Sequence, residues 1–99
     1  MDKVTSKSGI AIRLTDERWR HIAEEHGELD GMRQLVLDAI KLPDRVLVGS
    51  DEEFLAVRQV EAGKYLIVVY RELKDDGFVI TAFLTRRYRS LAKRKQLWP

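Results

Sequence analysis

Apolar side chains recur with the period of a helix in two segments between residues 16 and 41. One stripe follows the pattern W-x2-I-A-x2-H within residues 16–26, with Thr15 before it as an N-cap and Gly27 after it. A second stripe covers residues 32–41 and stops before Pro43. These patterns predict two amphipathic helices. The run GIAIRL at residues 9–14 predicts a short strand or an extended lead-in to the first helix.

After Pro43 the apolar residues change to the alternation that is typical of β-strands. Four such segments are separated by short polar turns: residues 45–49, 54–60, 65–73 and 78–85. Connections this short pair consecutive strands antiparallel. The pattern therefore predicts an α+β fold in which two N-terminal helices pack on one face of a four-stranded antiparallel β-meander.

The turns also predict a register for the last three strands. Glu61 is expected to pair with Lys64, and Leu73 with Phe78. Because side chains alternate between the faces of a strand, each face can then be assigned. One face is expected to carry Tyr70, Thr81 and Thr85, and the other Arg58, Arg71 and Arg86.

Length and composition describe one small domain. The chain has 99 residues, with an expected core at residues 9–87 and a tail at residues 86–99. It has no cysteine, which excludes disulfides, thiolate zinc sites and a cysteine nucleophile. The longest apolar run, residues 65–70, has six residues, whereas a membrane span needs about 20. The N-terminus has no apolar segment of a secretory signal, so we expect a cytoplasmic protein without membrane association.

Charge is unevenly distributed along the chain. The net charge is +2, but residues 86–99 hold six basic residues and no acid, so the remaining 85 residues, with 12 basic and 16 acidic side chains, carry −4. This basic tail favours a polyanionic partner, most often a nucleic acid, while the alternative is a solvated terminal segment that aids solubility. Its cations are Arg86, Arg87, Arg89, Lys93, Arg94 and Lys95.

His21 and His26 are the only histidines. They are five positions apart, about 140° around a helix, so they cannot chelate one ion together. Glycine-rich phosphate loops are also absent, and we therefore expect neither a metal nor a cofactor. Either histidine can act as a general acid or base near neutral pH, or can be an ordinary surface or structural residue.

Three segments resemble a known family. They are RHIAEEHGEL at residues 20–29, DAIKLPDRV at residues 38–46, and the strand pair YLIVVYREL and GFVITAFLTRR. In order and spacing they are similar to the small phage-type nucleases of the barnase–EndoU–colicin–RelE superfamily. The residues AFLT depart from that pattern, which has an aromatic residue and a proline before the threonine. The resemblance implies helices followed by an antiparallel meander, and metal-independent cleavage of RNA by a toxin or phage-associated protein.

The sequence therefore predicts a small endoribonuclease that cleaves through the 2′-hydroxyl group. The resemblance and the side-chain chemistry together suggest catalytic residues His21, His26, Arg58 and Thr85. The residues expected to bind RNA are Tyr70, Thr81, Arg86, Arg87, Arg89, Lys93, Arg94 and Lys95. Two alternatives remain: a non-catalytic nucleic-acid-binding or phage-associated module, and a module that binds an acidic protein such as an antitoxin or immunity protein.

Overall fold

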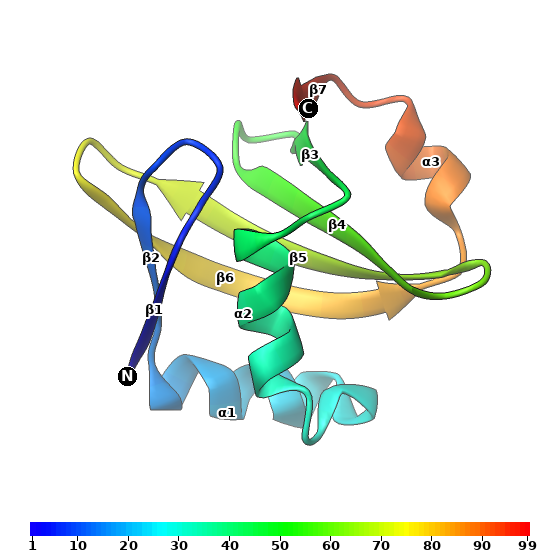
Figure 1. Ribbon diagram of the computed structural model, residues 1–99. Helices are drawn as coiled ribbons and strands as arrows, with labels where there is room; N and C mark the ends of the chain where they lie inside the picture. Colours follow the sequence, from blue (N-terminus) through cyan, green and yellow to red (C-terminus); the bar gives the residue numbers. More distant parts are fainter.

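The computed structural model describes residues 1–99 and contains one twisted mixed sheet with helices against it (Figure 1). The elements in chain order are β1 (Asp2–Thr5), β2 (Ala11–Leu14), α1 (Asp16–Glu25), the 3-10 turn η1 (Gly27–Leu29), α2 (Arg33–Lys41), β3 (Arg45–Val48), β4 (Phe54–Glu61), β5 (Lys64–Glu72), β6 (Asp76–Thr85), α3 (Tyr88–Ala92) and β7 (Gln96–Trp98). None of the helices has the length and apolar content needed to cross a bilayer.

The predicted fold class is wrong. Strands β3 to β6 are consecutive antiparallel neighbours, but they form part of a seven-stranded sheet with the order β1-β2-β6-β5-β4-β3-β7. Strand β2 runs parallel to β6, with Ala11 beside Asp76. Strands β1 and β7 have four and three residues, too few to show an alternating pattern. They form because they pair with β2 and β3, which are interactions that local periodicity does not reveal.

Strand β5 is the centre of the sheet and is buried on both faces. Its residues 66–70 are all buried. One face, which we call the helix face, joins α1, η1 and α2 in the main apolar core. The opposite face, which we call the outer face, carries a smaller cluster of Leu47, Leu55, Val57, Ile67 and Val69. Tyr88 and Leu91 of α3 pack against this smaller cluster.

A β-bulge in β4 changes the predicted register. Glu61 does pair with Lys64, but the register shifts between Gln59 and Glu61, and Arg58 then lies beside Leu66. Because Leu66 belongs to the main core, Arg58 points toward the helices.

A second bulge lies between the pairs formed by Val69 and Tyr70. Val69 pairs with Thr81, whereas Tyr70 pairs with Val79, not with Thr81 as predicted. Tyr70 and Val79 belong to the helix-face core, and Val69 belongs to the outer cluster. The bulge therefore places Tyr70 and Thr81 on opposite faces of the sheet.

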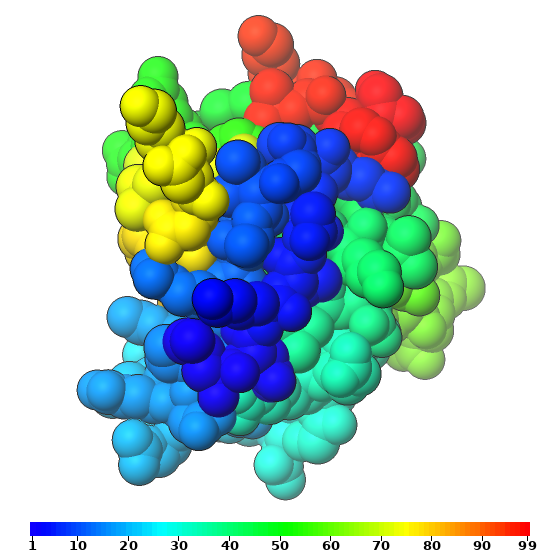
Figure 2. Space-filling model, turned by 60° about the vertical axis from the view of Figure 1, so that its left-hand side comes forward, coloured from blue at the N-terminus to red at the C-terminus, as the bar shows by residue number.

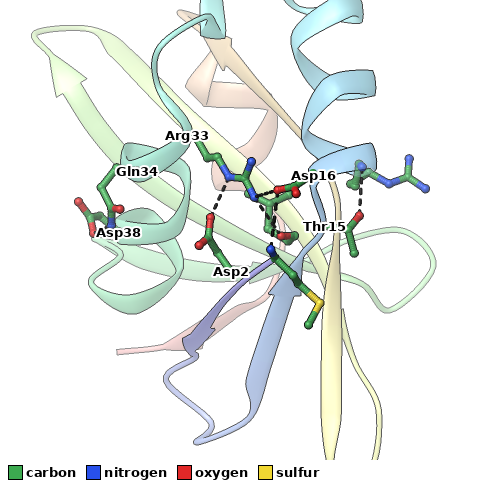
Figure 3. Close-up of polar contacts among 9 residues, drawn as sticks. Asp2, Thr15, Asp16, Arg33, Gln34 and Asp38 are labelled. Atoms are coloured by element: carbon green, nitrogen blue, oxygen red, sulfur yellow. Dashed lines mark hydrogen bonds and ion pairs between the residues drawn. The ribbon is translucent and has the colours of Figure 1, made fainter.

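Arg33 of α2 connects three elements through its guanidinium group (Figure 3). Its Nε donates to Asp2 Oδ2 of β1 at 2.8 Å, and its Nη2 donates to Asp16 Oδ1 of α1 at 2.7 Å. The hydrogen bond from Arg33, with the nearby N-terminal ammonium group, holds the pKa of Asp16 below its ordinary value. The pairing raises the pKa of Arg33, most strongly through Asp16.

The turn between β1 and β2 also meets the last residues of the chain. In Figure 2 the N-terminal hairpin, in blue, reaches the C-terminal residues, in red. There the Lys7 ammonium lies 4.7 Å from the centre of the Trp98 ring. This cation–π contact links the β1–β2 turn to β7, whose pairing with β3 is short.

We predict that Arg33→Gln lowers the melting temperature by a few degrees, because it frees β1 from α2. Because the pKa of Asp16 is lowered in the folded protein, the ion pair of Asp16 with Arg33 stabilises the fold above the ordinary carboxyl pKa. This stabilisation is lost as pH falls through the folded-state pKa. The difference in melting temperature between the two proteins should therefore shrink in acid. Circular dichroism between pH 7 and pH 2 measures it. Arg20 is an exposed α1 residue without an ion pair, and Arg20→Gln is the control. An equal decrease in the melting temperature of this control would contradict the stabilising role of the Arg33 ion pairs.

Candidate nucleic-acid interface

A groove lies where the β4–β5 turn, the end of β6 and the start of α3 meet. Its volume is about 660 Å³. The lining residues are Gly63, Tyr65, Arg86, Arg87, Tyr88, Arg89 and Ser90. We call it the tyrosine–arginine groove, because these two residue types supply its aromatic surface and its charge.

Two stacked tyrosines form the aromatic part of the groove. The ring centres of Tyr65 and Tyr88 are 4.6 Å apart, and the rings are inclined by 27°. The guanidinium carbon of Arg45 lies 5.3 Å from the centre of the Tyr88 ring. Strand β5 presents Tyr65 on the outer face, where it packs against the same cluster as Tyr88. The stack is therefore fixed on one side by the sheet.

The arginines of the groove differ in their pairing. Arg86 Nη2 lies 3.1 Å from Glu61 Oε1, so its charge is partly compensated. The side chains of Arg87 and Arg89 are exposed and form no ion pair or side-chain hydrogen bond. Two guanidinium groups are thus free to meet an anion beside the stacked rings.

Local hydrogen bonds hold the turn between β6 and α3. The Arg87 backbone N–H donates to Thr85 Oγ1 at 3.0 Å, and the Ser90 hydroxyl donates to the Arg87 carbonyl at 3.1 Å. Thr85 pairs across the strands with Tyr65. Its hydroxyl, predicted to be catalytic, therefore shapes the backbone of the turn and still has a proton to donate.

The remaining cations of the tail lie beyond the groove. Lys93 is the C-cap of α3, and the Lys95 carbonyl accepts a hydrogen bond from the Val48 N–H of β3 at 2.9 Å. Arg94 Nε is buried and has no hydrogen-bond partner. The first three of the six predicted tail cations thus line the groove, and the other three do not.

The two histidines occupy different surroundings. His21 is exposed on α1, with Nε2 3.9 Å from Glu17 Oε1, and it lines a polar pocket that shares no residue with the tyrosine–arginine groove. His26 is half-buried at the end of α1, and its ring centre lies 6.3 Å from that of Phe83 in β6. Only His26 contacts the sheet strand that leads to the groove.

Arg58 and Tyr70 lie on the helix face, away from the groove. Arg58 Nη1 donates to the Asp38 carbonyl of α2 at 3.3 Å, which fixes the end of that helix against β4. Tyr70 is 1% exposed. Burial, and to a smaller extent the charge of Glu72, raise the pKa of its hydroxyl above the ordinary value. In these positions both side chains stabilise the packing of the helices on the sheet.

Thr81 lies on the outer face, at the β6 bulge, and its hydroxyl is buried without a hydrogen-bond partner. Thr81, Phe83 and Thr85 alternate along β6 and share this face. Because Phe83 lies between Thr81 and Thr85, its contact with His26 places this histidine close to the strand segment that carries both threonines. No three His, Cys, Asp or Glu side chains gather in a way that could hold a metal ion.

Tyr65, Tyr88 and Arg45 were not among the predicted site residues. Tyr88 follows directly on the basic run from Arg86, so the sequence signals an aromatic residue among cations. Tyr65 and Arg45 join it only through the strand register and the fold of α3. No family model, curated protein or solved structure matches this chain.

The raised pKa of Tyr70 leads to a prediction. Because its folded-state pKa exceeds the unfolded value, it contributes stability that is complete below about pH 10 and is lost as pH rises further. In an ultraviolet titration, Tyr70 should ionise in a late step, and Tyr70→Phe should remove that step. Tyr65→Phe serves as the control and should leave it. A late step that survives Tyr70→Phe would show that another tyrosine is the protected one.

Proposed function

We propose that this protein binds single-stranded RNA in the tyrosine–arginine groove. The observation that supports it is the stacked pair of Tyr65 and Tyr88, flanked by the unpaired guanidinium groups of Arg87 and Arg89. Aromatic rings bind unpaired bases by stacking, and cations beside them bind the phosphates. Both requirements of a single-strand site are met within one groove.

Charge and shape agree with this proposal. The tail carries +6 without an acid, and only Glu61 brings a carboxylate to the groove. In a duplex the flat faces of the bases are covered by neighbouring base pairs, so the stacked tyrosines favour a single strand. The resemblance of three segments to RNA-cleaving proteins favours RNA over DNA as the polymer.

Metal-independent RNA cleavage is the second candidate function. In that reaction a base removes the proton of the 2′-hydroxyl, the 2′-oxygen attacks phosphorus, and the 5′-oxygen leaves with a proton from an acid. The contact between His26 and Phe83 favours it, because it holds an imidazole beside the strand that ends at the groove. His26 would act as the base, with Thr85 and the groove arginines stabilising charge. His21 and Arg58 lie elsewhere in the fold.

An acidic protein partner and an association with phage stay predictions. The same cations that would bind phosphates could be covered by an acidic inhibitor, such as an antitoxin. Competition between RNA and such a protein for the groove would follow from the proposed function.

Binding is tested by fluorescence anisotropy with a labelled oligouridine. Tyr88→Ala should weaken binding about 10-fold, because it removes one stacking platform. The double variant Arg87→Gln/Arg89→Gln should reduce the slope of log K against log salt by about 1.4, since each lost phosphate contact removes about 0.7. Arg20→Gln on α1 is the matched control and should change neither quantity. Equal affinity of wild type and Tyr88→Ala would exclude the groove as the binding site.

Cleavage is tested on single-stranded RNA in the presence of EDTA. If the second candidate function is correct, His26→Gln lowers the rate about 100-fold or more, the usual range for loss of a general base, and removes one limb of the pH profile. His21→Gln should leave the rate unchanged, because its pocket is separate. A loss that is equal in the two variants would refute the assignment of the base to His26. Circular dichroism of both variants checks that the fold is intact.

A further inference from the structure

Three side chains form a row across the sheet at the end remote from the groove. Arg13 of β2 pairs with Phe78 of β6, and Phe78 pairs on its other side with Arg71 of β5. Residues paired in register point to the same face. Their chain neighbours Ile12, Val79 and Tyr70 lie in the helix-face core, so the row lies on the outer face. We call it the arginine–phenylalanine row.

The row has free positive charge. Arg71 forms no ion pair and no side-chain hydrogen bond, whereas Arg13 Nη1 lies 3.0 Å from Asp76 Oδ2. A pocket of about 270 Å³ opens beside the row, and Arg13 and Phe78 both line it. Arg18 of α1 lines the same pocket, and its guanidinium group is unpaired as well. Phe78 thus has Arg13 and Arg71 as its neighbours on the two adjacent strands and shares a pocket with Arg18, and of these three cations only Arg13 is paired with an acid.

The row and the tyrosine–arginine groove lie at opposite ends of the same two strands. Along β5 Tyr65 and Arg71 are six positions apart, about 20 Å at the rise of a β-strand. Between them β6 presents the partly exposed residues Ile80, Thr81 and Phe83 on the outer face, above the buried Ile67 and Val69 of β5, and none of these is acidic. A bound strand could cross this face without meeting a carboxylate.

We infer that the arginine–phenylalanine row is a second subsite for single-stranded RNA, which continues from the groove across the outer face. This inference rests on the proposed function, because the groove supplies the first contact. In the row a base stacks on Phe78, while Arg71 and Arg18 bind the phosphates on either side of it. The binding site is then longer than the groove, and affinity depends on the length of the strand.

The test compares two oligouridines of about 4 and about 12 nucleotides, the range of site sizes for small single-strand binding domains. The wild type should bind the longer one more tightly. Arg71→Gln/Phe78→Ala should weaken binding of the longer strand about 10-fold and leave the shorter one unchanged. Arg87→Gln/Arg89→Gln should weaken both, since both strands use the groove. Arg20→Gln is again the control.

Each outcome decides a separate point. If the row variants bind both lengths as the wild type does, the second subsite is excluded while the proposed function stands. If the wild type binds neither strand, the proposed function and the subsite fail together. Should Phe78→Ala disturb folding, Arg71→Gln alone still serves. It should reduce the salt slope for the longer strand by about 0.7, and an unchanged slope would overturn the inference.

Discussion

Both faces of β5 have to be kept from water, and the rest of the structure follows from this requirement. Five consecutive residues of the strand, 66–70, are buried, and burying each large apolar side chain contributes about 1.5–3 kcal/mol. Helices α1 and α2 cover the helix face, while the outer face has only the short α3 at one end. The partial cover over the outer face is what makes a groove with stacked tyrosines possible.

Sequence patterns predicted the elements better than their arrangement. The two helical stripes and the four alternating segments lie within a few residues of α1, α2 and β3 to β6, because each has its own period and turn signals. The parallel contact of β2 with β6 joins Ala11 to Asp76, and no local signal reports it. No sequence pattern predicts the bulges beside Gln59 and after Val69 either, yet these bulges turn Arg58 and Tyr70 toward the helices.

The candidate site could be predicted as far as charge alone determines it. Arg86, Arg87 and Arg89 lie together because they are neighbours in the chain. Their tyrosine partner from β5 depends on the register, and Phe78 becomes part of a cationic row only because β2 runs parallel beside it. Thr85 was predicted as a site residue beside these arginines, and the structure adds that its hydroxyl holds the turn that carries them.

The separation of charge along the molecule gives it an electric dipole moment. Residues 15–31, which contain α1 and η1, carry six acids and two bases, while residues 86–99 carry six bases and no acid. These two segments lie at opposite ends of the fold in Figure 1. In the field of a polyanion the molecule therefore turns its α3 end forward before contact, and the acidic end is repelled. Such orientation raises the association rate constant at low ionic strength and leaves the dissociation rate constant to the short-range contacts.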